Sequence, residues 1–494
     1  MTRFEQPTID WAALSPELVL LGGASLCLVV TLFLPWSWRR PFCATVAALC
    51  FIGAGVAAGI LFAVDDSARS VIADAIRRDR LAELAQILVA GSGLLAVGAS
   101  LGWERQERSR VGEYYALLLS AAAGMSFFVA ASNLMTLFLG LEWFSISLYV
   151  LTAIAVESLP SLEAGLKYLI VGSFGSAILL FGSAFVYGAT GAIGFEDIAA
   201  AAGGADRLLF VIGLALILVG LAFKMSAAPF HMWTPDVYQG APTPVTAFMS
   251  AATKVAALVG TMRLLVTAFP TEARLWTVAL AVIACISLAW GNLAALVQTD
   301  IKRLLAYSSI SHAGFLLIPV AVGTRLGGRA LLFYLVSYAA MNVGSFAIVA
   351  ARERELARPV TFDGLAGLGW ERPGFGIAMS LFMFGFIGLP PAGLFLGKFY
   401  AFSAAVDRGW TWLAIVGVAA TVLSIYYYAG VIGAMYFRHS IEVRIAPAGG
   451  SPPRDWALSA AVGAAVVVTV GSFIAAGPLL DIARESVSFL GFPH

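Results

Sequence analysis

The sequence predicts an all-α protein that crosses a membrane many times, and three observations lead to this fold class. First, 60% of the 494 residues are hydrophobic and only 12% are charged, whereas a soluble globular protein carries about 25% charged residues. Second, the apolar residues form runs of about 20, the length that spans a bilayer as a helix. Third, the connections between the runs are mostly short, so no soluble domain fits between them.

The apolar runs predict about 14 transmembrane spans within a single integral membrane domain that covers residues 1–494. In order, the predicted spans are 16–36, 41–63, 82–103, 112–131, 134–156, 164–188, 208–228, 245–268, 275–296, 304–323, 329–350, 376–406, 411–436 and 456–478. An even number of spans places both termini on the same side of the membrane. Basic residues are slightly more frequent in the connections on the opposite side, so the positive-inside rule favours termini outside the cell.

Two of the spans are expected to be broken helices. The stretch 223–254, FKMSAAPFHMWTPDVYQGAPTPVTAFMSAATK, joins the seventh and eighth spans and contains four prolines, which stop or kink a helix. The twelfth span, 376–406, is too long for one straight crossing and contains Pro390-Pro391 near its middle. Two interrupted helices at corresponding places predict inverted repeats, here spans 4–8 and 9–13, with a transport site near mid-membrane.

Lysine is rare in this chain and unusually placed. There are five lysines, and four of them fall inside apolar runs: Lys167, Lys224, Lys254 and Lys398. A lysine at the bilayer centre costs about 2.5–3.5 kcal/mol on insertion scales. Unlike an arginine, a desolvated lysine can titrate near neutral pH. We therefore interpret these lysines as part of an ion path, and we expect the one arginine within a span, Arg263, to lie near a helix end.

Glu142, in LFLGLEWFSISLYVL, is the only carboxylate deep inside an apolar run, and Ser145 and Tyr149 extend a polar stripe on its helix. A Glu–Lys pair that opens and closes would take up and release a proton, which links Glu142 to Lys224 and Lys254. The alternative is that Glu142 forms a purely structural pair. The alternative for the two lysines is that they snorkel or satisfy carbonyls at the broken helix. Lys254 is too central to snorkel easily, whereas Lys224 is placed to cap carbonyls at the break.

Four further residues are candidates for the path. Lys398 follows the second break and either joins the path or caps carbonyls there. Lys167 lies four residues after Glu163, so it fits a helical ion pair as well as proton transfer. His312, in AYSSISHAG, is flanked by hydroxyls that could hold water, and we interpret it as a relay member. His231, in the first break, is either a relay member or a packing residue.

Several chemistries are excluded by missing motifs. The chain has no GxxxxGK[ST] loop and no GxGxxG after a strand. No helix offers spaced histidines for haem, and the four cysteines, which stand alone, predict neither an iron–sulfur cluster, a metal cage nor a disulfide framework. The net charge of +1 gives no indication of a nucleic-acid partner. We therefore expect the chain to carry no redox centre, cofactor or metal of its own.

The stretch FKMSAAPFHMWTPDVYQGAPTPVTAF resembles the signature of the antiporter-like membrane subunits of respiratory complex I. Similar motifs are GLEWFSISLYVL, EAGLKYLIVGSFGSAILLFGSAFVYGATG, QTDIKRLLAYSSISHAGFLL and LPPAGLFLGKFYAF. The resemblance begins near residue 110 and places an antiporter-like core at about 110–437. Two positions depart from the family pattern, because Gln239 stands where Glu is common and Leu394 stands where Gly is expected.

The resemblance implies a series of buried charges at mid-membrane, namely Glu142, Lys224, Lys254 and Lys398, and Lys167 also matches a family lysine. It implies a non-redox, proton-translocating subunit of a bacterial NADH–quinone oxidoreductase in the cell membrane. NADH, flavin, iron–sulfur clusters and quinone would be bound by other subunits of the hetero-oligomer. The same charges also suit a subunit of a multisubunit Na⁺(K⁺)/H⁺ antiporter, although TPDVY and TPVTAF with Lys254 favour the complex I branch. A third interpretation is a spacer that only docks other subunits.

Overall fold

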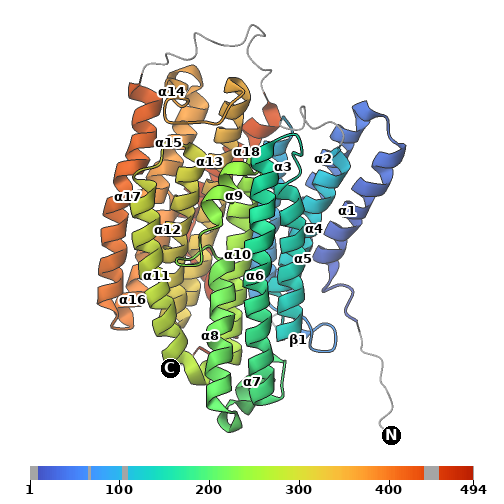
Figure 1. The fold of residues 1–494 in the computed structure, drawn as a ribbon, viewed down its shortest axis with the longest axis vertical. Helices are drawn as coiled ribbons and strands as arrows, with labels where there is room; N and C mark the ends of the chain where they lie inside the picture. The colour runs from blue at the N-terminus through green and yellow to red at the C-terminus, as the bar shows by residue number, and fades with distance from the viewer. Residues whose placement is uncertain (1–8, 65–67, 103–109, 439–454, 493–494) are drawn as a thin grey trace.

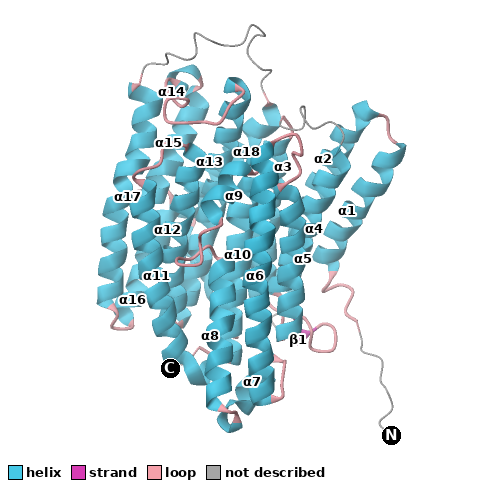
Figure 2. Cartoon of the chain, viewed as in Figure 1, coloured by secondary structure: helices cyan, strands magenta, loops and turns pink. Residues whose placement is uncertain are grey.

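The computed structural model describes residues 9–64, 68–102, 110–438 and 455–492. Over these residues the chain is a bundle of helices that run mostly along one axis (Figure 1). The strands in this part of the chain are two residues each, β1 (Arg69–Ser70) and β2 (Arg77–Arg78), and they form one small hairpin (Figure 2). The predicted all-α membrane fold is confirmed.

Thirteen helices in the described ranges are long and apolar enough to cross a membrane, and each corresponds to one predicted span. They are α1 (Ser15–Phe33), α2 (Trp36–Val64), α3 (Arg80–Ser100), α4 (Val111–Val129), α5 (Leu134–Thr152), α6 (Leu159–Thr190), α8 (Arg207–Lys224), α10 (Thr243–Ala268), α11 (Ala273–Ala295), α12 (Ile301–Val322), α13 (Arg325–Leu356), α17 (Thr411–Phe437) and α18 (Trp456–Ile474). The remaining predicted span, 376–406, is formed by two shorter helices in series, α15 (Pro373–Ile387) and α16 (Gly393–Asp407).

Side-chain caps fix where key helices begin. Asn133 accepts a hydrogen bond of 2.7 Å from the backbone N–H of Thr136 at the start of α5. Asp300 accepts one of 2.8 Å from the backbone N–H of Arg303 at the start of α12. Such caps satisfy N–H groups that have no partner within the helix. They set the starting points of the two helices that carry Glu142 and His312.

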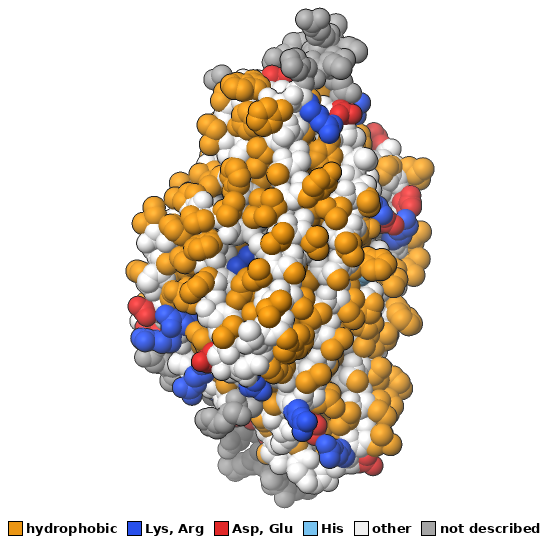
Figure 3. Space-filling model, turned by 90° about the vertical axis from the view of Figure 1, so that its left-hand side faces the viewer, with side chains coloured by type: hydrophobic (Ala, Val, Ile, Leu, Met, Phe, Trp, Pro, Cys, Tyr) orange, Lys and Arg blue, Asp and Glu red, His pale blue; other side chains and the backbone are white. Residues whose placement is uncertain are grey.

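Helices α10, α12 and α13 form the centre of the bundle. In the most apolar 18-residue stretch of each helix, all residues of α10 and 94% of those of α12 and of α13 are buried. The corresponding share is 28% in α2 and 33% in α17. The outer helices carry exposed apolar side chains, which dominate the face seen in Figure 3, while charged side chains gather in a few clusters. A surface of this kind suits contact with lipid, so a residue midway along α10 is surrounded by protein.

The two expected helix breaks are present. Helix α8 ends at Lys224, residues 225–233 form turns, and the short helix α9 (Thr234–Gly240) continues in the same direction in Figure 1. Likewise α15 ends at Ile387 and α16 begins at Gly393, with Pro390-Pro391 between them. The first break lies in the fourth span of the series 4–8, and the second lies in the fourth span of the series 9–13. Because each series has an odd number of spans, the second series starts on the opposite side of the membrane. The predicted repeat of spans 4–8 and 9–13 is compatible with this order, and its internal symmetry stays a prediction.

Several short elements were not predicted. These are α7 (Phe195–Ala201), α14 (Leu368–Glu371), α19 (Ala476–Ser486), and the 3₁₀ turns η3 (Ala202–Gly204) and η4 (Pro270–Glu272). They lie in or after the connections, where apolar run length carries no signal. Arg263 lies in the last two turns of α10, as expected for a position near a helix end, and its two terminal nitrogens donate to Asp79 at 2.5 and 2.6 Å.

Candidate functional site

Lys224, the last residue of α8, is buried at the first break, with only 2% of its surface exposed. Its ammonium group donates a hydrogen bond of 2.6 Å to the hydroxyl of Ser145 on α5 and a longer one of 3.4 Å to Tyr168 on α6. The ring centre of Phe144 lies 4.5 Å from the same nitrogen, a distance at which a ring face stabilises a cation. The lysine is therefore held by neutral groups.

Glu142 lies one turn before Ser145 on α5 but does not form a direct pair with Lys224. Within the described ranges, no oxygen of Glu142 approaches a lysine nitrogen within the 4.0 Å that defines an ion pair. One carboxylate oxygen, Oε1, is buried without a hydrogen-bond partner among the described residues. The carboxylate still acts electrostatically on Lys224. In the structure the hydroxyl of Ser145, rather than the carboxylate of Glu142, is therefore the close partner of Lys224.

Lys254 satisfies a backbone carbonyl at the first break. It lies midway along α10, is 1% exposed, and donates a hydrogen bond of 2.8 Å to the carbonyl of Met225, the residue that directly follows Lys224. Carbonyl capping was the alternative that the sequence left open, and of the two lysines it suited Lys224 better. In the structure it is Lys254 that makes such a contact, because a side chain of a neighbouring helix can reach a carbonyl that the end of α8 leaves free.

Lys398 repeats this arrangement at the second break. It is 4% exposed and donates hydrogen bonds to the carbonyls of Phe386 and Ile387, at 2.9 and 3.0 Å, which end α15. Gly388 follows with a φ of +94°, and a side chain there would have its Cβ 2.9 Å from Cδ of Lys398. Glycine therefore allows both the turn and the close approach of the lysine. The departure at Leu394 lies in the first turn of α16, where this side chain is fully buried.

His312 lies in a buried cluster of hydroxyl groups between the two breaks. Its ring nitrogens form hydrogen bonds with Tyr334, at 2.8 Å, and with Tyr428, at 3.1 Å. The hydroxyl of Tyr428 also bonds to Ser308. The charges of both Lys254 and Lys398 act on His312, so it lies within electrostatic reach of each lysine. We call the partly buried Glu142 and the buried Lys224, Lys254, His312 and Lys398 the buried charge series.

The remaining two candidates do not join this series in the structure. Lys167 has a side chain that is 44% exposed, and it pairs with Glu163 at 2.7 Å and with Asp236 at 2.8 Å. His231 packs with its ring centre 5.7 Å from that of Trp290, and its Nδ1 has no hydrogen-bond partner among the described residues. Their surroundings match the structural alternatives that the sequence left open.

Sequence reasoning missed the aromatic hydroxyls of the site, which include Tyr168, Tyr334 and Tyr428. They lie within spans rather than at the span ends, where the aromatic belts of membrane proteins gather. That position is the signal that could have identified them. Two further buried hydroxyls, of Thr234 and Ser345, have no hydrogen-bond partner among the described residues. Buried polar groups of this kind are commonly satisfied by ordered water.

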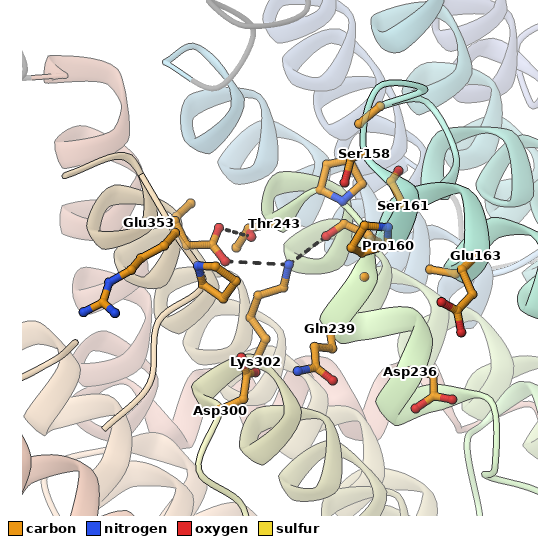
Figure 4. A pocket seen from close by; sticks show the side chains of 18 of the residues that line it. Ser158, Pro160, Ser161, Glu163, Asp236, Gln239, Thr243, Asp300, Lys302 and Glu353 are labelled. Atoms are coloured by element: carbon orange, nitrogen blue, oxygen red, sulfur yellow. Dashed lines mark hydrogen bonds and ion pairs between the residues drawn. The ribbon is translucent and has the colours of Figure 1, made fainter. Parts of the chain in front are cut away.

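A cavity of about 680 Å³ opens at the end of the bundle where α10 and α12 begin (Figure 4). Lys302 donates to the carbonyl of Ala241 at 2.7 Å and lies 3.8 Å from Glu353, which also accepts a hydrogen bond from Thr243. Gln239, the other departure from the family pattern, lies on this wall and accepts a hydrogen bond of 3.0 Å from Arg303. Lys254 follows Thr243 by 11 residues, about 16 Å along a helix. The cavity thus lies at the start of the helix that carries Lys254.

No group of three or more His, Cys, Asp or Glu residues that could hold a metal ion occurs in the described ranges. The four cysteines are all free, two of them buried and two partly buried. The groups gathered at the two breaks are instead lysines, hydroxyls, an imidazole and backbone carbonyls. Lysine and imidazole can bind and release protons, and hydroxyls and carbonyls can hold them by hydrogen bonds.

Residues 131–424 match the family model described as "NADH:quinone oxidoreductase/Mrp antiporter, TM". The chain is similar to NADH-quinone oxidoreductase subunit N of Trichlorobacter lovleyi, with 40% identity over 491 residues and 98% of each chain covered. It is equally similar to the protein of that name from Granulibacter bethesdensis, with 40% identity over 492 residues, 97% of this chain and 100% of the relative.

Solved structures are also similar to the chain. A chain of respiratory complex I from Thermus thermophilus is 32% identical, with a TM-score of 0.79 and coverage of 95% of this chain and 99% of that chain. A chain of the Mrp complex from a Dietzia species has a TM-score of 0.83 at 22% identity, over 97% of each chain, and this likeness shows the fold alone. The chain belongs to the family of NADH-quinone oxidoreductase subunit N.

Proposed function

We propose that this chain is the proton-translocating, non-redox membrane subunit of a bacterial NADH–quinone oxidoreductase, and that the buried charge series carries the protons. One observation supports this proposal above the others. Lys224, Lys254 and Lys398 are each less than 5% exposed, and their hydrogen-bond partners are hydroxyls and carbonyls. A buried lysine that served only as a fixed positive charge would be expected to pair with a carboxylate, because an isolated charge is costly in lipid.

Neutral partners suit lysines that must change their protonation state. When such a lysine releases its proton, no carboxylate is left unpaired, so the cost of becoming neutral is small. Both forms of the amine can still donate to a hydroxyl or a carbonyl. An arginine at the same place would stay charged. The chemistry of the three sites therefore favours proton exchange over permanent charge.

The contacts connect the members of the buried charge series one after another. Glu142 acts on Lys224, Lys254 bonds to the residue next to Lys224, and His312 lies in reach of both Lys254 and Lys398. A charge change near Glu142 would alter the hold of Lys224 on its proton, and the change would then pass to Lys254. Hydroxyl groups and water would bridge the distances between these residues by hydrogen bonds. Lys398 would connect to the exit or to the next subunit.

The electron transfer that drives this movement takes place elsewhere in the proposed complex. Other subunits would hold NADH, flavin, iron–sulfur clusters and quinone, and this chain would contact neighbouring membrane subunits and lipid. The complex would lie in the bacterial cell membrane, with the termini of this chain on the outer side. The latter assignment rests on the modest excess of basic residues at the opposite end.

Cation dependence distinguishes the pump from the Na⁺(K⁺)/H⁺ antiporter alternative. In inverted membrane vesicles that contain the assembled complex, we expect NADH-driven proton uptake at the same rate in choline buffer and after addition of Na⁺ or K⁺. The reason is that lysines and a histidine can pass protons without a metal cation. Proton movement that requires added Na⁺ or K⁺, with transport of that ion in the opposite direction, would favour the antiporter.

Substitution of Lys167 by Gln is expected to leave proton pumping close to wild type. Its ammonium group is partly exposed and lies between two carboxylates, an arrangement worth about 0–1 kcal/mol at a surface. The measurement is NADH-driven acidification of vesicles, normalised to the amount of assembled complex. A loss as large as that expected for the buried lysines would place Lys167 in the transfer pathway, as its match to a family lysine suggests.

A further inference from the structure

A second cavity, of about 750 Å³, lies at the other end of the bundle, near the start of α3 and of α13 and beside α19. Its wall includes four arginines, Arg80, Arg325, Arg329 and Arg484, and two carboxylates, Asp79 and Glu485. None of these residues belongs to the buried charge series. The cavity therefore needs an explanation that is independent of proton transfer.

The two carboxylates of the cavity are already neutralised. Asp79 binds both terminal nitrogens of Arg263, at 2.5 and 2.6 Å, and Arg263 lies behind the cavity wall on α10. Glu485 pairs with Arg80 at 2.9 Å. Because its two acidic groups are neutralised in this way, the cavity has a net positive charge from its remaining arginines.

Three arginines remain available to a ligand. Arg325 is exposed and forms no hydrogen bond or ion pair with the described residues. Arg329 donates from Nε to the carbonyl of Leu480 at 3.0 Å, which leaves its two terminal nitrogens for another partner. Arg484 has only a 3.8 Å contact with Asp481, and both side chains are more than half exposed. The first turn of α13, which holds Arg325, adds the partial positive charge of a helix N-terminus.

Exposed apolar side chains lie at two edges of the cavity. On one edge, Arg80 reaches the carbonyl of Phe62, and Val64, at the end of the same helix α2, is 73% exposed. On the other edge, Arg329 reaches α19, which directly follows Ile474, a residue that is 78% exposed. Helix α3 packs against both α2 and α18. The cavity thus adjoins surfaces that suit lipid chains on either side of α3.

We propose that this cavity binds the phosphate of an anionic phospholipid, with the acyl chains along the exposed ends of α2 and α18. Guanidinium groups form paired, charge-assisted hydrogen bonds with phosphate oxygens, and basic pockets between membrane helices bind lipid head groups. The excess of positive charge disfavours a zwitterionic head group, whose amine would approach the same arginines. The bound lipid would join the start of α13 to α19.

The test uses the purified, assembled complex after mild delipidation in a neutral detergent. Phosphatidylglycerol, phosphatidylcholine or inorganic phosphate is added back, and bound lipid is measured by mass spectrometry together with the thermal unfolding temperature. Arg325→Gln, Arg329→Gln and the double variant are compared with Arg274→Gln, which removes an exposed arginine outside the cavity. For wild type and Arg274→Gln we expect phosphatidylglycerol to bind and to raise the unfolding temperature, with little effect of phosphatidylcholine.

In the double variant, we expect the affinity for phosphatidylglycerol to fall about tenfold or more, because charge-assisted hydrogen bonds to the phosphate are lost. Equal binding by the double variant and Arg274→Gln would overturn the proposal. Binding of inorganic phosphate as strong as that of the lipid would assign the site to a free anion instead. Loss of a neighbouring subunit without a change in bound lipid would assign it to an acidic segment of that partner. If the double variant does not assemble, the single variant Arg325→Gln decides, since this side chain has no partner among the described residues.

Discussion

Replacing Lys254 by Ala is expected to remove the contribution of this subunit to NADH-driven proton pumping. The side chain lies in the most buried helix of the bundle, and His312 is within electrostatic reach of it. A positioned proton-transfer group typically contributes about 10²–10⁴-fold to a rate, and the structure offers no second lysine on α10 to replace it. The measurement is proton uptake by inverted vesicles per NADH oxidised, with assembly of the complex confirmed on native gels.

A second substitution separates proton transfer from carbonyl capping. Lys254→Gln keeps an N–H donor that can reach toward the carbonyl of Met225, but it cannot carry a proton. If Lys254 only satisfies that carbonyl, Ala should cost about 1–3 kcal/mol of stability and Gln should restore both stability and pumping. We expect Gln to restore stability alone. Wild-type pumping by the assembled Gln variant would rule out Lys254 as a proton carrier.

The second large effect is expected for Lys224→Arg. Arginine preserves the positive charge and can donate to the hydroxyls of Ser145 and Tyr168, which hold Lys224 in place. It cannot release a proton in a protein. We therefore expect pumping to fall as far as it does for Lys224→Ala, although the fixed charge is retained. The result to measure is again the number of protons moved per NADH oxidised.

The matched control is Arg207→Lys, an exchange of the same two residue types at the exposed start of the same helix, and it should pump normally. Glu142→Gln tests the other member of the pair. It removes the charge that acts on Lys224, so we expect reduced pumping with assembly intact. Normal pumping by Lys224→Arg would mean that Lys224 serves only as a fixed charge.

Much of the fold followed from the sequence because the bilayer imposes simple rules. Run length gave the spans, and the prolines near 229 and 390 located the two breaks. Short helices such as α7 and α19 were missed, since they lie in or after the connections, where apolar run length carries no signal. The single span predicted over 376–406 is two helices, as its length and its prolines suggested.

The candidate site was predicted in its residues but not in its contacts. The cost of a charge in lipid singled out Glu142 and the buried lysines. That rule says nothing about which carbonyl a lysine reaches, so the contact of Lys254 with the carbonyl of Met225 was not predicted. The hydroxyl partners, above all Tyr334 and Tyr428, are brought to His312 by helix packing between distant parts of the chain. No local pattern in the sequence predicts these contacts of His312.

The contact between Lys254 and the carbonyl of Met225 has a thermodynamic consequence. An ammonium group holds a carbonyl more strongly than a neutral amine does, so proton occupancy and the shape of the first break are linked quantities. Linkage is reciprocal. If protonation of Lys254 stabilises the contact with the carbonyl of Met225, then forming this contact must increase the proton affinity of Lys254 by the same free energy. Lys398 has the same relation to the carbonyls of Phe386 and Ile387. The conformation of each interrupted helix therefore depends on the protonation of its lysine. A force that moved either helix would change the proton affinity of that lysine.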